Sequence, residues 1–234
     1  MNIELVGLDQ QDYLNINQKN KKGAPMIRKE KLAELDKLIN LYRTVSQSSV
    51  QIEPVNEGFI KIGTANYTLA SGKVLLDRKE IIKRDGLSSA SIILPITETG
   101  EVVLIVQPRP LTKTGVGVEL PAGYKDLLPD NKSVEEGKIT ALRELSEETG
   151  YQAKEIIPLG GYYQDQGCSR AYNECFLALD CVYKGTEDFD EDEQISKFLC
   201  SFDEVLELVE QGYINDGGSI ITIERAKNIL LKNN

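Results

Sequence analysis

Three glutamates within five residues, Glu144, Glu147 and Glu148, are the residues whose types and spacing could do chemistry. On an α-helix, residues three and four positions apart share a face, where like charges repel by about 0.2–0.5 kcal/mol per pair. Arg143, four residues before Glu147, would offset one of these charges, and a divalent cation would offset the others. The spacing therefore leaves two interpretations open, a solvated acidic helix face and a metal-binding carboxylate cluster.

The composition limits the chemistry further. The 234 residues include no histidine, and 27 Lys and Arg against 37 Asp and Glu give a net charge of −10. The missing histidine excludes Ser-His-Asp and Cys-His catalysis and His-ligated zinc or haem, and it favours hard cations such as Mg²⁺, Mn²⁺ or Ca²⁺ on carboxylates. The negative charge argues against nucleic-acid and acidic-membrane partners, and an anionic substrate would require a local metal ion or arginine.

The element that must position the glutamates is a helix predicted over residues 133–149. Ser133 is a candidate N-cap, Glu135 and Glu136 follow in the first turn, and Gly150 stands where a helix-ending residue belongs. The same helix has an apolar side for a core, formed by Ile139, Leu142 and Leu145. The predicted helix therefore has one face for packing and one for the carboxylates.

The rest of the chain mixes both kinds of element. Apolar periodicity predicts an amphipathic helix over residues 27–45, and β texture begins at residue 50, with strands over 59–63, 67–70, 73–85, 90–96, 102–109, 156–163, 173–183 and 195–201. Ser201 or Asp203 would cap a helix that ends at Gly212, and Asp216 or Ser219 would open a final helix. This order predicts an α+β fold or a layered α/β/α fold with a mixed sheet.

We expect three segments: an N-terminal extension with the amphipathic helix (1–49), a small β unit (50–88) and a larger domain (89–234). The longest clean apolar run, residues 102–106, is far too short to span a membrane, and no signal peptide is visible. Four cysteines without a C-x-x-C pair are expected to be reduced thiols, so the predicted location is the cytoplasm.

The string from Arg143 to Tyr151, RELSEETGY, resembles the core of the Nudix hydrolase signature, Arg-Glu-apolar-x-Glu-Glu-x-Gly-apolar. The signature also has a glutamate eight residues before the arginine, which Glu135 matches, and a glycine six residues before that glutamate, where this chain has Pro129. Gly123 is the plausible matching glycine, so the loop between them is about six residues longer than the pattern. This extra length lies either within the loop or at the start of the helix.

The resemblance implies a Nudix α/β/α sandwich and a set of metal-site roles. Glu144 and Glu148 would bind Mg²⁺, with Mn²⁺ as a substitute, and Glu147 and the carbonyl of Ala122 would complete the site. Arg143 would hold a carboxylate in place, and Glu135 is the remaining glutamate of the signature.

The flanks resemble the ADP-ribose pyrophosphatase group from about Ile60 onward. The matching stretches are residues 91–95, 103–109, 119–123, 173–178 and the acidic run 190–193. By this resemblance Arg109 would contact the substrate diphosphate, Glu119 and Gly123 would belong to the substrate site, and Glu191 or Glu193, together with Glu147, is a candidate for activating water. The acidic run is equally consistent with a solvated turn.

The implied activity is Mg²⁺-dependent hydrolysis of ADP-ribose to AMP and ribose 5-phosphate by a homodimer that shares an N-terminal sheet. Two alternatives stay open: a Nudix pyrophosphatase for a nucleotide sugar or a dinucleotide, and a non-catalytic module that senses ADP-ribose. Tyr162, Tyr163 and Tyr172 would either stack on an adenine or pack half-buried on strands.

Overall fold

The structure is a computed structural model, and it describes residues 44–47, 51–53, 60–83, 87–109, 112, 115–129, 133–189 and 194–230. The chain forms two compact units, residues 1–48 with 66–76 and residues 49–65 with 77–234. Most of the amphipathic helix predicted over residues 27–45 lies outside the described residues. Its predicted end is wrong, because strand β1 (Thr44–Gln47) pairs antiparallel with residues 67–69.

A four-stranded sheet contains β1, β2 (Gln51–Glu53), β3 (Ile60–Leu69) and β4 (Val74–Lys83), in the order β1-β3-β2 with β4 beside β3. The two short strands predicted over 59–63 and 67–70 form one continuous strand, β3. Gly72, at φ 81°, turns the chain from β3 into β4, and its amide donates to the carbonyl of Leu69.

The second sheet has eight strands in a mixed arrangement: β5 (Ala90–Thr97), β6 (Glu101–Pro108), β7 (Val116–Glu119), β8 (Ala122–Tyr124), β9 (Tyr151–Gln152), β10 (Glu155–Tyr163), β11 (Tyr172–Tyr183) and β12 (Ser196–Ser201). Its main path is β10-β11-β5-β6-β12, while β7, β8 and β9 pair with β6, β5 and β11. The central pair β5–β11 is parallel and the other pairs are antiparallel.

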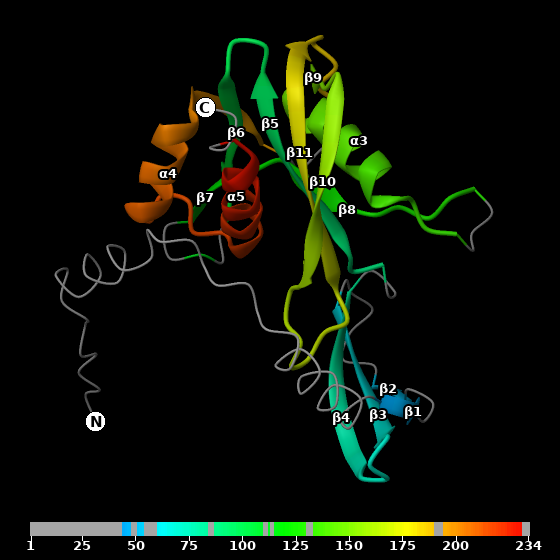
Figure 1. The fold of residues 1–234 in the computed structure, drawn as a ribbon. Coiled ribbons are helices and arrows are strands. Elements are labelled where there is room, and N and C mark those ends of the chain that lie inside the picture. The colour runs from blue at the N-terminus through cyan, green and yellow to red at the C-terminus, as the bar shows by residue number, and fades with distance from the viewer. Residues whose placement is uncertain are drawn as a thin grey trace, which may run out of the picture. The chain divides into compact units, whose positions relative to one another are not determined.

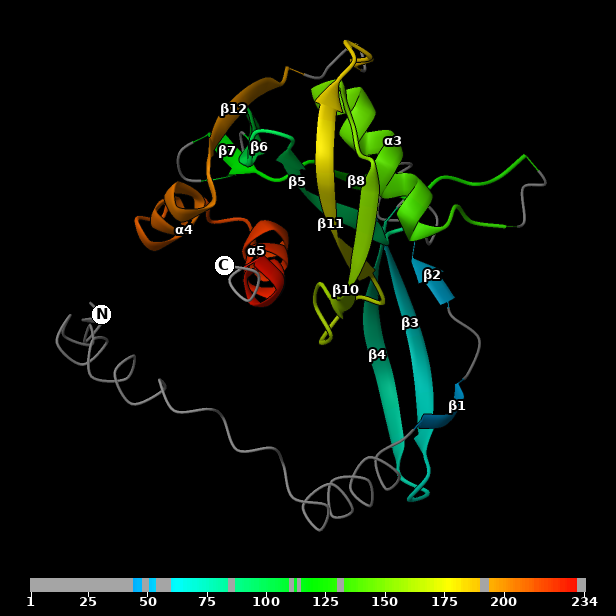
Figure 2. The ribbon, with the colours of Figure 1, turned by 45° about the horizontal axis from the view of Figure 1, so that its top comes forward.

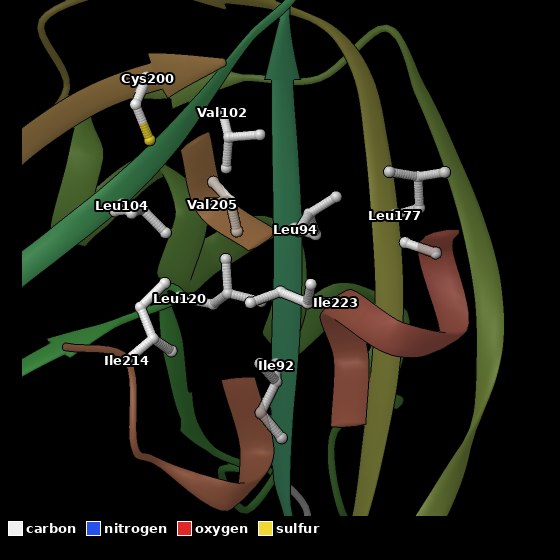
Figure 3. Packing of buried hydrophobic residues seen from close by; sticks show 11 residues of the cluster. Ile92, Leu94, Val102, Leu104, Leu120, Leu177, Cys200, Val205, Ile214 and Ile223 are labelled. Atoms are coloured by element: carbon white, nitrogen blue, oxygen red, sulfur yellow. The ribbon is translucent and has the colours of Figure 1, made fainter. Parts of the chain in front are cut away.

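Helices cover both faces of this sheet (Figures 1 and 2). Helix α3 (Gly137–Thr149) packs on one face, where Ile93 of β5 and Leu145 belong to one buried cluster. Helices α4 (Phe202–Glu210) and α5 (Gly217–Leu230) cover the other face, where Figure 3 shows Ile92 and Leu94 of β5 with Ile223 of α5. Successive residues of β5 thus belong to buried clusters on opposite faces of the sheet. This confirms the predicted α/β/α sandwich with a mixed sheet.

Three of the predicted helix ends are confirmed. Gly150 ends α3 in the left-handed region at φ 71°. Ser201 and Glu204 form a capping box at the start of α4, and Asp216 accepts a hydrogen bond from the amide of Ser219 at 2.7 Å at the start of α5. No helix in the described ranges is long and apolar enough to cross a membrane. All four cysteines are free thiols, three of them buried, as predicted.

Candidate active site

The glutamate-rich helix begins later than predicted. Its N-cap is Glu136, not Ser133, because Ser133 belongs to the preceding loop: its carbonyl accepts from the amide of Leu128 at 2.9 Å. The ends of this loop are tied together by a bridge between Leu127 and Val134 and by a 2.9 Å bond from the amide of Glu135 to the carbonyl of Asp126. The extra length relative to the signature therefore lies within the loop and does not lengthen the helix.

The start of α3 is stabilised from a distant strand. Glu136 makes no side-chain cap, and the first turn carries no acidic residue. The carboxylate of Glu174 on β11 lies against Gly137 so closely that a Cβ at this position would overlap it, and Lys125 holds that carboxylate in an ion pair. A negative charge at a helix N-terminus is favourable, and glycine is the residue that lets it approach.

Arg143 binds the carboxylates of α3 through one nitrogen and the preceding loop through another. Its Nη1 lies 2.8 Å from a carboxylate oxygen of both Glu144 and Glu147. Its Nη2 donates to the carbonyl of Tyr124 at 3.0 Å and to Glu135 at 3.2 Å, and it lies 3.3 Å from the carboxylate of Asp126. One guanidinium thus fixes the helix face against both ends of the loop.

The charges around Arg143 keep it ionised. Burial lowers the pKa of the guanidinium, but the hydrogen bond to Glu135 and the charge of Glu144 outweigh this and raise it above its ordinary value. Glu135 is buried, and it also accepts a 2.9 Å hydrogen bond from the hydroxyl of Thr140. Glu135 therefore serves as an anchor behind Arg143, and it does not line the cavity described below.

The first two residues of β8 lie close to the carboxylates of α3. The amide of Ala122 donates to Glu148 at 2.9 Å, and a Cβ at Gly123 would be 1.8 Å from Oε1 of Glu144. Glycine is thus required for the present position of the Glu144 carboxylate. Just before β8, the amide of Leu120 donates a 2.9 Å hydrogen bond to the buried hydroxyl of Ser219 on α5.

The donor types suit a hard divalent cation, since the carboxylates and the carbonyl of Ala122 are all oxygen ligands. As the side chains lie, no three Asp, Glu or Cys groups among the described residues are arranged to hold one ion. Glu144 and Glu147 are bound to Arg143 instead, and Glu148 is bound to the amide of Ala122. These oxygen donors suit a divalent cation, and they lie close to one another. A cation would compete with Arg143 for the carboxylates.

The candidate diphosphate residue, Arg109, forms a two-point ion pair. Its Nε and Nη2 donate to the two carboxylate oxygens of Glu119 at 2.9 and 2.7 Å, and Gln107 donates to the same group at 3.2 Å. The hydrogen bond with Glu119 raises the pKa of Arg109 against the opposing effect of burial. Nearly half of the Arg109 side chain is exposed, so the guanidinium remains accessible from solvent.

One open cavity of about 930 Å³ brings most of the predicted residues together. They line it as follows: Arg109, Glu119, Ala122, Gly123, Arg143, Glu144, Glu147 and Glu148. Tyr162, one of the tyrosines considered for stacking, lines it too, and so do Asp126, Asp188, Asn173 and Asp216, which were not predicted as site residues. Asp126 and Asp188 stand in no local pattern, so nothing in the sequence indicated that they line the same cavity as the carboxylates of α3.

The segment before the acidic run is attached to the end of α3. The amide of Asp188 donates to the carbonyl of Glu147 at 3.1 Å, and the hydroxyls of Ser146 and Thr186 are 2.7 Å apart. Between them Glu187 pairs with Lys197, and the hydrogen bond from Lys197 lowers the pKa of Glu187 to about 2. The candidate bases Glu191 and Glu193 lie outside the described residues.

A glutamate-rich helix lies on a mixed sheet, with its carboxylates at a cavity that also holds an accessible arginine, and these are residue types that hydrolases of phosphate-containing substrates use. Comparison with known families identifies the family of this hydrolase. The NUDIX domain model matches residues 87–219, more than half of the chain, and the protein belongs to this family. Nudix hydrolases generally use divalent metal ions.

Individual relatives agree with this assignment. The chain is 30% identical to an ADP-ribose pyrophosphatase of Bacillus subtilis, covering 78% of this chain and 93% of the relative. It is 29% identical to a GDP-mannose pyrophosphatase of Escherichia coli K12, covering 68% and 83%. A crystal structure of an ADP compounds hydrolase, 18% identical, has the same fold, with a TM-score of 0.66 over 82% of this chain and 97% of that one.

Proposed function

We propose that the protein hydrolyses the diphosphate of ADP-ribose, with Mg²⁺, to AMP and ribose 5-phosphate. The observation that carries the proposal is the convergence of Glu144, Glu147 and Glu148 with Arg109 on one cavity. Water supplies the oxygen that bonds to one phosphorus, the bridging P–O bond breaks, and the proton of the water passes to a carboxylate. The relative from Bacillus subtilis supports ADP-ribose as the substrate.

The proposed role of each residue at the cavity follows from its charge. Bound Mg²⁺ would neutralise the diphosphate and make the bound water more acidic. Glu144 and Glu148, with the carbonyl of Ala122, would hold the cation, and Arg143 would restrain the carboxylates that the cation leaves free. Arg109 would exchange Glu119 for the diphosphate, because a guanidinium binds either anion with two hydrogen bonds.

The group that takes the proton is a choice among Glu147, Glu191 and Glu193. Glu147 is partly exposed and lines the cavity, which favours it among the described residues. A base must reach the water within about 2.6–3.2 Å or through one further water. Separate Gln substitutions of the three glutamates, assayed by single-turnover kinetics, would identify the base as the one whose loss lowers the single-turnover rate constant most.

A nucleotide sugar is the second candidate substrate. The E. coli relative that bears the name GDP-mannose pyrophosphatase supports it. The metal and arginine chemistry proposed above addresses only the diphosphate, which both substrates share. The ratio of kcat/KM for ADP-ribose to that for GDP-mannose would separate the two.

We also propose a homodimer formed through the N-terminal sheet. Val74 and Leu76 on β4 leave about half or more of their surface exposed, which is costly for apolar side chains in water unless a partner covers them. Light scattering after size exclusion should give a mass near 52 kDa, twice the 26.0 kDa of one chain. Leu76→Asp should yield the single-chain mass if the sheet is the interface.

The test of the activity is a panel of nucleoside diphosphate derivatives with and without Mg²⁺. We expect E147Q/E148Q together to abolish turnover, and E207Q/E210Q to leave it unchanged. The control pair is also two glutamates of one helix, α4, and does not line the cavity. Hydrolysis of no compound by the wild type, or full activity in E147Q/E148Q, would contradict the proposal.

A further inference from the structure

The long loop between β8 and α3 contributes a charged residue to the cavity. The described parts of this loop extend away from the sheet (Figures 1 and 2). Asp126, near its start, lies between the glycine and the glutamate of the Nudix signature, where the signature specifies no residue type. Its carboxylate lines the cavity, and half of the side chain is exposed. Asp126 therefore adds a negative charge to the site, and the hydrolysis proposed above gives that charge no role.

The backbone of Asp126 is fixed where the two arms of the loop meet. Its carbonyl accepts a 2.9 Å hydrogen bond from the amide of Glu135, which lies two residues before the first residue of α3. The neighbouring residues Leu127 and Val134 form a bridge between the same two arms. The closed loop therefore holds the Asp126 carboxylate at a defined place beside the start of the glutamate-rich helix.

The Asp126 carboxylate lies on the loop side of the Arg143 guanidinium. Nη2 of Arg143 is 3.3 Å from a carboxylate oxygen of Asp126, while Nη1 is 2.8 Å from the carboxylates of Glu144 and Glu147 on α3. The third nitrogen, Nε, is buried and has no hydrogen-bond partner among the described residues. The guanidinium is thus held through its two terminal nitrogens, one by the loop and one by the helix.

The helix side and the loop side of Arg143 have opposite effects on a cation. Glu144 is a proposed ligand, so Arg143 must give up this carboxylate, at least in part, when a cation binds. A partly buried guanidinium that loses one anion needs another, because an unpaired charge away from water is costly. On the loop side, Asp126 and Glu135 are the anions that remain beside Nη2.

We infer that Asp126 is a positioning residue that draws Arg143 toward the loop and so leaves Glu144 available to the divalent cation. Without this charge, the helix carboxylates would bind the guanidinium more strongly, and a cation would compete less well for them. Glu135 does not replace Asp126, because its oxygen that faces Arg143 also accepts a 2.9 Å hydrogen bond from Thr140. The inference rests on the proposed function, because it takes Glu144 as a ligand of the cation.

Binding of Mn²⁺, followed by the loss of the electron paramagnetic resonance signal of the unbound ion, tests this role without any substrate. Asp126→Asn keeps the size of the side chain and removes its charge. We expect the Kd for Mn²⁺ to rise about threefold, a modest change because ion pairs of partly exposed groups are weak. Asp126→Glu, which keeps the charge, should restore most of the affinity. In the hydrolysis assay, the Mg²⁺ concentration for half-maximal rate should rise by a larger factor than kcat at saturating Mg²⁺ falls.

A double-mutant cycle separates this role from a general effect of charge. An ammonium cannot hold the loop and the helix at once, so Asp126→Asn should have little effect on the Kd for Mn²⁺ when Arg143 is replaced by lysine. The same rise in Kd in both backgrounds would overturn the inference, because the charge of Asp126 would then act on the cation directly. Asp203→Asn, in the first turn of α4 and away from the cavity, is the matched control and should leave the Kd unchanged.

The remaining outcomes also decide the role of Asp126. An unchanged Kd in Asp126→Asn, or an affinity as weak in Asp126→Glu as in Asp126→Asn, would overturn the inference, and so would a wild type that binds no Mn²⁺. The comparison with Asp126→Glu also decides the case if Arg143→Lys fails to fold. A wild type that binds Mn²⁺ but hydrolyses no nucleoside diphosphate derivative would contradict the proposed function alone, since the binding measurement contains no substrate.

Discussion

Gly123→Ala is expected to abolish most of the activity without destabilising the protein. The added Cβ would be 1.8 Å from Oε1 of Glu144, whereas real Cβ atoms stay at least 3.0 Å from such neighbours, so the carboxylate must move by at least 3.0 − 1.8 = 1.2 Å. A displacement of about 1 Å in a catalytic group can cost about 100-fold in rate, or about 2.7 kcal/mol. Glu144 can move because it is the end of a flexible side chain, and Gly123 does not have a positive φ, so alanine fits the backbone.

The assay has two parts. Steady-state kcat/KM over a Mg²⁺ titration should fall about 100-fold with a weaker apparent metal affinity. The melting temperature should stay level or rise slightly, because Gly→Ala reduces the conformational entropy of the unfolded chain. Gly167→Ala is the control, since its Cβ would come no closer than 3.3 Å to the nearest heavy atom, in Asp165. Wild-type kcat/KM and metal affinity in Gly123→Ala would refute the assignment of Glu144 as a ligand held in place by this glycine.

Three further outcomes are expected. Arg143→Lys should lower kcat/KM by about 10- to 100-fold, because an ammonium cannot bridge the helix and loop carboxylates as the two guanidinium nitrogens do, and steady-state kinetics check it. Glu174→Gln should lower the melting temperature by about 1–2 °C through the lost charge at the start of α3, as calorimetry would show. Because the hydrogen bond from Lys197 lowers the pKa of Glu187, the ionised carboxylate contributes its full stabilisation of the fold above about pH 4.5. This contribution is lost as the pH falls through about 2. Glu187→Gln should flatten that part of a pH–melting profile, and an unchanged profile would refute it.

Local sequence patterns predicted most elements of the α/β/α sandwich, and they failed where distant residues decide. The start of α3 is one case: Ser133 has the preferred chemistry of an N-cap, but its carbonyl is used by Leu128 in the loop. The anion that stabilises the start of the helix is Glu174, which lies 37 residues after Gly137 and has no sequence signal linking it to the helix. The merging of two predicted strands into β3 likewise depends on pairing with β1 and β2.

The candidate site was predicted to a similar extent. Helical spacing correctly linked Arg143 to Glu147, but not to Tyr124 or Asp126, which the fold brings to the same guanidinium. Asp216 was correctly predicted as a candidate helix cap. That Asp216 also lines the cavity depends on where α5 packs. Periodicity indicates which residues share a helix face, and it does not indicate what another element places opposite them.

The buried hydrogen bond between Leu120 and Ser219 also sets an order of events during protein synthesis. The two residues are 99 positions apart, so at about 5–20 residues per second the ribosome adds Ser219 about 5–20 s after Leu120. Throughout that interval the amide of Leu120 lacks its native partner, and the face of the sheet that α5 covers remains open. The start of β8, which contacts Glu144 and Glu148, is thus attached to α5 late. A nascent chain interrupted before α5 should bind neither the cation nor the diphosphate.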